Sequence, residues 1–263
     1  MDLQLQNKRA FVAGSSRGLG YAAARILAQE GCRVVLNART ESSLTNTARD
    51  LADETGADVY AVPGDVSQPD TPRKLIQEAI SKLGGLDLLL TNAGGPPAAA
   101  FSSIDEETWQ HAIELSFMSH VRLIQAALPH LKRSPAPSVL TVTSYSVKQP
   151  IPNLVLSNSI RSATIGLTKT LALELGGDGI RFNSILPGWT KTERVNELMQ
   201  HRAEAAGTSV EEEIQKQMDN SALGRIGTPQ EFGNVAAFLL SPAASYVTGA
   251  MLAVEGGMYK GTF

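Results

Sequence analysis

The chain has 263 residues, of which 43% are hydrophobic and 19% are charged, and its formal net charge is −3. These values suit one large soluble α/β domain and exclude a strongly basic surface for nucleic acid or anionic membranes. The single cysteine, Cys32, excludes an intrachain disulfide and is typical of a reducing compartment. No apolar run is long enough to span a membrane, and the first residues lack the pattern of a signal peptide. We therefore expect a cytoplasmic protein that binds neither nucleic acid nor membranes.

Short apolar runs alternate with helical patterns along the whole chain. Strands are predicted at residues 10–13, 33–37, 58–62, 86–90, 138–143, 180–186 and 250–254. Helices are predicted between them at residues 21–30, 41–55, 71–83, 105–132, 153–175 and 228–240. This alternation predicts an α/β fold in a single domain, residues 1–263, with one doubly wound parallel sheet of the Rossmann type and helices on both faces. Ligands of such folds bind beyond the carboxyl ends of the strands.

Residues 189–227 interrupt the alternation. They hold two amphipathic helical patches, and either Thr208 with Glu211 or Ser209 with Glu212 has the spacing of a capping box. A long excursion at the ligand end of the sheet predicts a helical lid over a substrate. The alternative is a surface helical hairpin that only packs on the domain.

A glycine-rich turn follows the first predicted strand and leads directly into the first helix. Its residues are Gly14, Ser15, Ser16, Arg17, Gly18, Leu19 and Gly20. Glycine permits the tight turn, the close approach of a ligand and close helix packing, while the helix N-terminus offers N–H groups to an anion. The spacing is a variant of the dinucleotide fingerprint, so we expect these residues to hold a diphosphate. The alternative is a turn that merely packs.

The end of the second predicted strand bears on the choice of nicotinamide cofactor. NAD selectivity usually requires an acidic residue there, but the chain has Asn37 and Ala38. Arg17 and Arg39 flank the same region, and two guanidinium groups favour a 2′-phosphate. We therefore expect NADP(H) in preference to NAD(H). The alternative is that both arginines are solvated surface residues.

The loops after the strands share their motifs and spacing with one known family. The glycine turn is followed by Asp65-Val66, by Asn92-Ala93-Gly94, by Ser144, and by Pro187-Gly188 with Thr192. In this order the pattern resembles the short-chain dehydrogenases/reductases, particularly the bacterial 3-oxoacyl-[acyl-carrier-protein] reductases and sugar dehydrogenases. The match runs over nearly the whole chain.

The resemblance implies roles for the matching residues. Asp65 and Val66 should flank the adenine, and Asn92, Ala93 and Gly94 should line the path of the ribose and diphosphate. Pro187, Gly188 and Thr192 should lie at the nicotinamide end. The resemblance also implies a homo-oligomer, a tetramer or a dimer.

The catalytic positions depart from the family pattern. The family reduces a carbonyl with an Asn, a Ser, a Tyr and a Lys, and only the Ser is present, as Ser144. Ser116 replaces the Asn, Ser157 replaces the Tyr, and Arg161 replaces the Lys. A serine hydroxyl is a far weaker acid than a phenol, and arginine stays protonated, although its fork can still bind ribose hydroxyls or orient Ser157.

Other proton donors lie beside Ser144. Tyr145 supplies a phenol, and Lys148 or Arg161 would lower its pKa by favouring the phenolate. The alternatives are that Tyr145 only packs and that Lys148 is a solvated loop residue. The four histidines lack metal-ligand spacing, so we expect no metal site.

These features predict an NADP(H)-dependent oxidoreductase with a non-standard catalytic set. It would reduce a carbonyl, such as that of a 3-oxoacyl group, or oxidise an alcohol in a small molecule. The alternatives are a cofactor-binding protein of this fold without reductase activity and a non-redox enzyme on this scaffold. The pocket is expected to be partly apolar, with no charged clamp.

Overall fold

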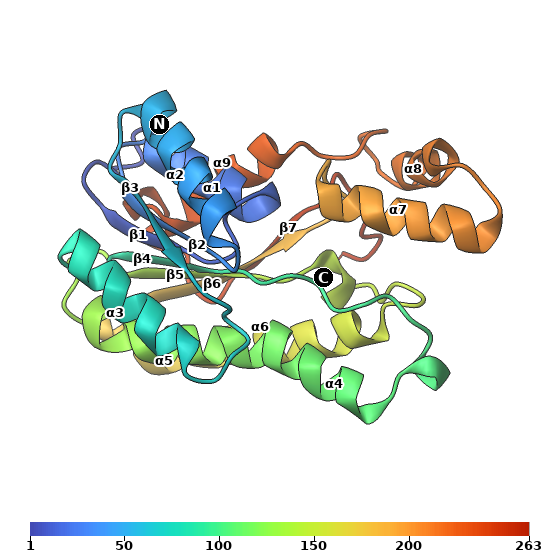
Figure 1. The fold of residues 1–263 in the computed structure, drawn as a ribbon, viewed down its shortest axis with the longest axis horizontal. Coiled ribbons are helices and arrows are strands. Elements are labelled where there is room, and N and C mark those ends of the chain that lie inside the picture. Colours follow the sequence, from blue (N-terminus) through green and yellow to red (C-terminus); the bar gives the residue numbers. More distant parts are fainter. Residues whose placement is uncertain (263) are drawn as a thin grey trace.

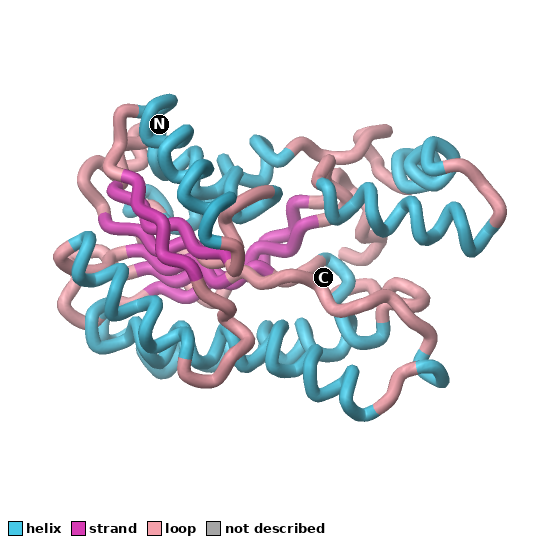
Figure 2. Tube along the Cα trace, in the orientation of Figure 1, coloured by secondary structure: helices cyan, strands magenta, loops and turns pink. Residues whose placement is uncertain are grey.

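A computed structural model describes residues 1–262 of the chain. Seven strands form one parallel sheet in the order β3-β2-β1-β4-β5-β6-β7 (Figures 1 and 2). The strands are β1 (Arg9–Val12), β2 (Arg33–Ala38), β3 (Val59–Pro63), β4 (Leu88–Thr91), β5 (Ser138–Val142), β6 (Arg181–Pro187) and β7 (Met251–Val254). The order reverses between β1 and β4, which is where doubly wound sheets bind their ligands.

Helices cover both faces of the sheet because the strands are apolar on both sides. Side chains alternate along β1, so Val12 faces one buried cluster and Phe11 faces the other. The first cluster packs under α1 (Gly18–Gln29), α2 (Glu41–Thr55) and α9 (Pro229–Leu240). The second packs under α3 (Thr71–Leu83), α5 (Ser119–Leu131) and α6 (Val155–Leu175) (Figure 1). This confirms the predicted fold class.

One predicted helix is divided. The segment expected as a single helix over residues 105–132 consists of α4 (Glu106–Ile113), a π-helical turn (Glu114–Met118) and α5. Such turns are rare inside helices and often occur at functional sites. The π-turn packs against α6, where the Thr164 hydroxyl donates to the Ser116 carbonyl (3.2 Å). A π-helical turn amounts to one residue inserted into an α-helix, and the helical periodicity of the sequence does not reveal such an insertion.

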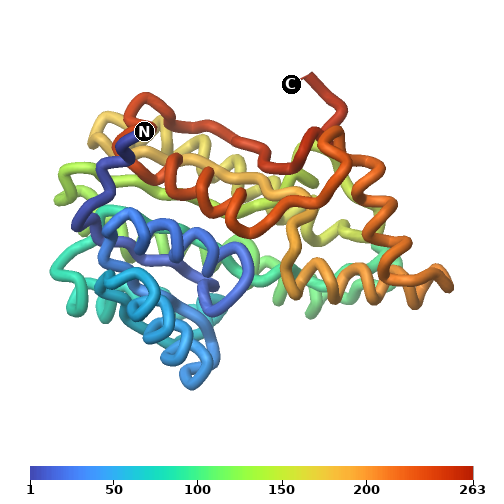
Figure 3. The backbone as a smooth tube through the Cα atoms, turned by 90° about the horizontal axis from the view of Figure 1, so that it is seen from above, coloured from blue at the N-terminus to red at the C-terminus, as the bar shows by residue number. Residues whose placement is uncertain are grey.

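The excursion at residues 189–227 forms α7 (Glu193–Ala206) and α8 (Val210–Asp219), which extend beyond the end of the sheet (Figures 1 and 3). Its apolar patches form a cluster of their own with Trp189, Met199 and Ile226. Ser209 and Glu212 form the capping box, which selects one of the two predicted pairs. None of the helices described for residues 1–262 is long and apolar enough to cross a membrane.

Candidate active site

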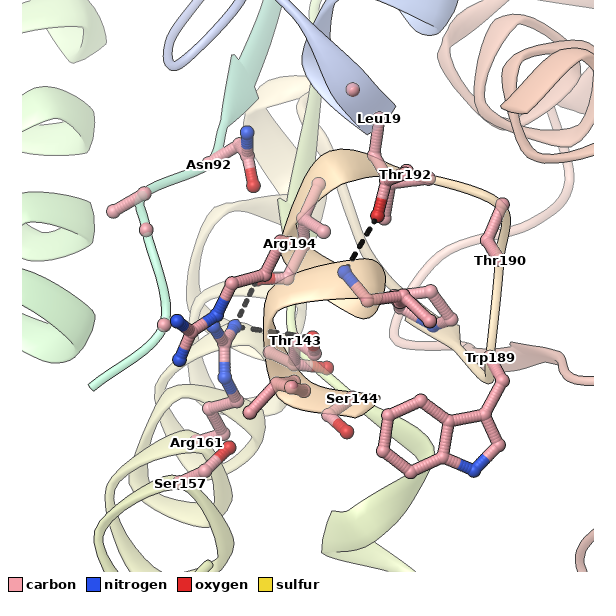
Figure 4. A pocket seen from close by; sticks show the side chains of 18 of the residues that line it. Leu19, Asn92, Thr143, Ser144, Ser157, Arg161, Trp189, Thr190, Thr192 and Arg194 are labelled. Atoms are coloured by element: carbon pink, nitrogen blue, oxygen red, sulfur yellow. Dashed lines mark hydrogen bonds between the residues drawn. The ribbon is translucent and has the colours of Figure 1, made fainter. Parts of the chain in front are cut away.

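The carboxyl ends of β1, β4, β5 and β6 border a pocket of about 340 Å³ (Figure 4). The pocket brings together most of the residues singled out in the sequence: Gly14, Arg17, Gly18, Leu19, Asn92, Ala93, Gly94, Ser144, Tyr145, Ser157, Arg161, Pro187, Gly188 and Thr192. The start of α7 supplies one wall, through Thr192 to Val195, Glu197 and Leu198. The first residues of the excursion therefore border the pocket.

The glycine turn has the geometry that its composition predicts. Gly14 has a φ of +60°, and a Cβ there would lie 2.7 Å from Asn92 Nδ2. Asn92 Nδ2 in turn donates to the Gly14 carbonyl (3.1 Å). A Cβ on Gly20 would lie 2.2 Å from the same carbonyl oxygen, so only glycine allows α1 to pack this closely on the turn. A side chain at either position would push the turn away from β4.

The start of α1 fits an anionic group. Arg17 occupies the N-cap position without a side-chain cap, and the first turn contains no acidic residue. The first N–H groups of the helix therefore have no side-chain cap as an acceptor. A Cβ on Gly18 would meet nothing closer than 3.9 Å, so backbone and ligand can approach there. These residues fit the diphosphate of a dinucleotide.

Ser15 does not have the expected role. Its Oγ donates to the Val12 carbonyl (2.7 Å) and accepts from the Asn37 N–H (3.0 Å), and its own N–H donates to the Asn37 carbonyl (2.8 Å). Ser15 is fully buried, so its donors hold the turn against β2 and none is left for a phosphate. Five further residues that were expected to bind the cofactor do not line this pocket: Ser16, Gly20, Arg39, Asp65 and Val66.

The structure confirms that β2 ends without an acidic residue, as the sequence indicates. Asn37 is buried, and its Nδ2 donates to the carbonyls of Val62 (3.0 Å) and Gly64 (3.1 Å). Arg39 is exposed, and Arg17 is exposed and paired with Glu193 at the start of α7. Arg39 directly follows β2, and β2 itself carries no carboxylate that would compete for an arginine.

Ser144, the retained catalytic position, follows β5. Its Oγ accepts from the Ser146 N–H (3.1 Å), which leaves its own proton available to the pocket. Ser116 lies elsewhere: it is buried in the π-turn, and its hydroxyl has no hydrogen-bond partner within residues 1–262. Lys148 also does not line the pocket, because its Nζ lies over the Tyr259 ring, 5.1 Å from the centroid.

The expected activation of Tyr145 is wrong. Burial raises the pKa of the Tyr145 phenol. A hydrogen bond with Trp189 and the charge of Arg202 lower this pKa and offset part of the rise. Neither Lys148 nor Arg161 contributes. Tyr145 packs against the cluster that contains Trp189, Met199 and Ile226, which explains its desolvation.

Arg161 makes its hydrogen bonds to groups other than Ser157, which was one of its expected partners. It is buried, and its Nη1 donates to the carbonyls of Val142 (3.2 Å) and Thr143 (3.1 Å) at the end of β5. Within the described chain it makes no hydrogen bond to Ser157, so it does not orient that hydroxyl. Burial and the charge of Arg194 lower the pKa of Arg161 to about 10, which leaves it cationic at neutral pH.

The lining residues that were not predicted from the sequence include Trp189 and Arg194. Trp189 borders the pocket under Arg202, whose guanidinium lies 4.9 Å from the ring centroid. Arg194 lines the pocket beside Arg161 and donates from Nη2 to the Pro96 carbonyl (3.1 Å). The pocket thus has charged groups, contrary to the expectation of no clamp. The spacing of Arg194 and Leu198 could have predicted that Arg194 lines the pocket, because residues four positions apart lie on the same face of a helix, here the apolar face of α7.

A family profile described as enoyl-(acyl carrier protein) reductase matches residues 13–259 of the chain. The chain belongs to the short-chain dehydrogenase/reductase family. It is 31% identical over 264 residues to the uncharacterized oxidoreductase YvrD of Bacillus subtilis (strain 168), covering 99% of each chain. It is 30% identical to the 3-oxoacyl-[acyl-carrier-protein] reductase FabG of Chlamydia muridarum, covering 98% of this chain and 100% of the relative.

The fold of this short-chain dehydrogenase/reductase is also found in solved structures. The L-sorbose reductase of Gluconobacter frateurii, complexed with NADPH and L-sorbose, superposes with a TM-score of 0.94 at 31% identity. The match covers 99% of this chain and 100% of that structure. The resemblance seen in the sequence is confirmed, and the chain is an oxidoreductase. Residues 1–262 contain no group of three or more His, Cys, Asp or Glu side chains placed to hold a metal ion.

Proposed function

We propose that the protein reduces the carbonyl group of a small ketone and that it uses NADPH rather than NADH. The observation that carries the choice of cofactor is the end of β2, where Asn37 is buried and bound and no acidic side chain is available for a ribose hydroxyl. Arg17 and Arg39 provide the cations that a 2′-phosphate requires. The L-sorbose reductase, a relative of the same fold, was solved with NADPH.

The residues of the pocket divide between the two ends of a dinucleotide. The N–H groups at the start of α1 and Gly18 would hold the diphosphate, and Asn92 to Gly94 would border its path. Thr192 accepts from the Val195 N–H (3.3 Å) and so fixes the start of α7 at the other end. When bound, NADPH supplies the hydride that the carbonyl carbon accepts.

The side chains at the end of β5 would act on the carbonyl oxygen. The Ser144 hydroxyl donates a hydrogen bond to that oxygen and so holds the ketone in place. The Tyr145 phenol, adjacent on the same loop and also lining the pocket, gives its proton to the developing alkoxide and regains one from water. Carbonyl, NADPH and one proton are consumed, and alcohol and NADP⁺ are formed.

The test of this proposal is a fluorescence titration of the protein with NADPH and with NADH. We expect NADPH to bind at least about tenfold more tightly, since a charged hydrogen-bonded pair is worth roughly 1.5–3 kcal/mol. Arg17→Gln and Arg39→Gln should each weaken NADPH binding and leave NADH binding unchanged. Arg49→Gln, on exposed α2, removes the same charge away from the pocket and serves as control. Equal affinities for the two cofactors contradict the proposal.

A further inference from the structure

Arg161 is a buried cation with no anion beside it. The residue is 8% exposed, and within the described chain only Nη1 is hydrogen-bonded, to two backbone carbonyls. Nε and Nη2 have no hydrogen-bond partner within residues 1–262. The nearest charge that acts on it is Arg194, a second cation. A buried charge is costly unless it is paired, so this arrangement calls for an anion from outside the chain.

The two guanidinium groups border the same empty space. A Cβ on Gly95 would lie 3.6 Å from Arg194 Nη2, 3.7 Å from Arg194 Nε and 3.9 Å from Arg161 Nη2. Because residue 95 is glycine, that point is left vacant. Figure 4 shows the guanidinium groups of Arg161 and Arg194 next to each other, with Ser144 and Ser157 nearby.

The carboxylates around this point are already paired with arginines. Glu193 pairs with Arg17, and Glu197 pairs with Arg194 through Nη1, with 3.6 Å between Arg194 Nη1 and Glu197 Oε2. Thr143 also lines the pocket, and its buried hydroxyl has no hydrogen-bond partner in the described chain. Within the described chain Arg161 Nε, Arg161 Nη2, Arg194 Nε and the Thr143 hydroxyl thus remain for a ligand.

We propose that the substrate is an oxo acid, whose carboxylate lies between Arg161 and Arg194 in the space beside Gly95. The inference rests on the proposed function and specifies its substrate class. Guanidinium groups bind carboxylates through paired hydrogen bonds, which are strong where water is excluded. With the carboxylate held there, the ketone extends toward Ser144, and the product is the corresponding hydroxy acid.

The diphosphate of the cofactor is the other anion that enters the pocket. Its donors are the N–H groups at the start of α1, whereas Arg161 comes from α6 and lies at the end of β5, beside Ser157. The donors for the two anions therefore come from different elements of the pocket. Measuring cofactor affinity in each variant separates the two roles.

The activity test compares acetoacetate and pyruvate with their methyl esters at saturating NADPH. Each pair differs in charge but has the same carbonyl. We expect kcat/KM of the protein to favour the acid by at least about tenfold, and Arg194→Gln to remove most of that preference. Arg161→Gln should do the same, and Arg161→Lys should retain part of it because the charge is kept. Arg49→Gln is the control and should leave the preference unchanged.

Gly95→Ala provides a variant that removes no charge. Its Cβ would meet its neighbours at ordinary contact distances, so the chain should fold, but the methyl group occupies the space assigned to the carboxylate. We expect its KM to rise for the acid more than for the ester. If Arg194→Gln and Gly95→Ala lower acid and ester reduction equally, the proposed carboxylate site is wrong.

Calorimetric titration of acetoacetate into the protein without cofactor gives a readout independent of turnover. Binding of the acid, with the methyl ester at least about tenfold weaker, is expected for the protein and lost in Arg194→Gln. Acid binding without any reduction would overturn the proposed function but keep the anion site. If the variants instead weaken NADPH binding and leave the acid preference intact, the arginines serve the cofactor and the inference falls.

Discussion

Arg17, in the glycine turn, forms an ion pair with Glu193, the first residue of α7. The pair joins the glycine turn to one wall of the pocket, and its two residues lie 176 positions apart in the sequence. Both side chains are exposed, at 68% and 63%. An exposed pair is weak and readily exchanged, so a 2′-phosphate that binds Arg17 competes with Glu193 for the same guanidinium.

Removing that competitor should strengthen cofactor binding selectively. We expect Glu193→Gln to lower the dissociation constant of NADPH by roughly two- to fivefold at low ionic strength, the range set by a weak exposed pair. The effect should shrink as salt is added, because salt screens exposed charges. Titration with both reduced cofactors measures it. An equal change for NADH would show that Glu193 acts through the position of α7 and not through the phosphate.

Gly14→Val should abolish binding of both cofactors. The position has a φ of +60°, where a β-branched residue is strained, and its Cβ would lie 2.7 Å from Asn92 Nδ2. The variant must displace Asn92 or open the turn, and either change moves the N–H groups at the start of α1. Fluorescence titration measures the loss, and circular dichroism serves to show that the chain is folded. A folded Gly14→Val protein with normal NADPH affinity would contradict this role.

The sequence predicted the sheet because continuous apolar strands and glycine-terminated helices are local patterns. It also placed Gly14, Asn92 and Ser144 correctly at strand ends, since parallel strands share one ligand edge. It did not predict the role of Ser15, because the sequence does not show whether a serine in a turn faces a ligand or a neighbouring strand. Nor did it reveal that Arg161 and Arg194, 33 positions apart in the chain, border one space. That proximity comes from the position of α7, whose first turns border the pocket beyond the carboxyl ends of the strands.

Restoring the family's catalytic pair should raise activity on neutral ketones. Ser157 lines the pocket, so a tyrosine introduced there has access to the substrate carbonyl, and lysine at 161 would favour its phenolate. We expect Ser157→Tyr/Arg161→Lys to increase NADPH oxidation with a methyl ketone ester and to reduce the preference for the acid. Ser157→Tyr alone is the matched control. If neither variant changes the rate, the substitution at Ser116 or the shape of the pocket limits the chemistry.

His120 should make the stability of the protein depend on pH. It is fully buried against Thr91, with 2.6 Å between Nδ1 and the threonine Oγ1. Burial, assisted by the charge of Arg161, lowers the pKa of His120 to about 3 from 6.5. The folded state therefore disfavours the proton that the unfolded chain accepts below about pH 6.5. The stability due to neutral His120 is complete above that pH and is lost progressively toward pH 3.

At pH 5 the loss corresponds to about 2 kcal/mol relative to pH 8, from 1.36 kcal/mol per pH unit. Urea unfolding of the protein and of His120→Gln at both pH values measures it. The variant should be less stable at pH 8, because it disturbs the buried contact with Thr91, but it should lose less stability between pH 8 and pH 5. Parallel losses in the two proteins would assign the pH dependence to other groups.

The last prediction concerns the proton donor. Tyr145 lines the pocket next to Ser144, and burial raises the pKa of its phenol, so the group is protonated at neutral pH. A protonated phenol is suited to giving a proton during reduction and less suited to accepting one during oxidation. Tyr145→Phe should therefore lower turnover by about a hundredfold or more, the effect of a positioned general acid, with NADPH affinity nearly unchanged. Ser157→Ala should cost much less.

The pH profile distinguishes a proton donor from a residue that only packs. Reduction catalysed by Tyr145 should persist to high pH and decline only above the ordinary phenol range near 10, because burial shifts the pKa upward. That alkaline decline should disappear in Tyr145→Phe, whose residual rate would depend on water or on Ser157. Trp189→Phe removes the hydrogen-bond partner of the phenol and keeps the apolar contact, so it should move the decline without abolishing activity. If Tyr145→Phe retains full turnover with an unchanged pH profile, a bound water or the Ser157 hydroxyl supplies the proton.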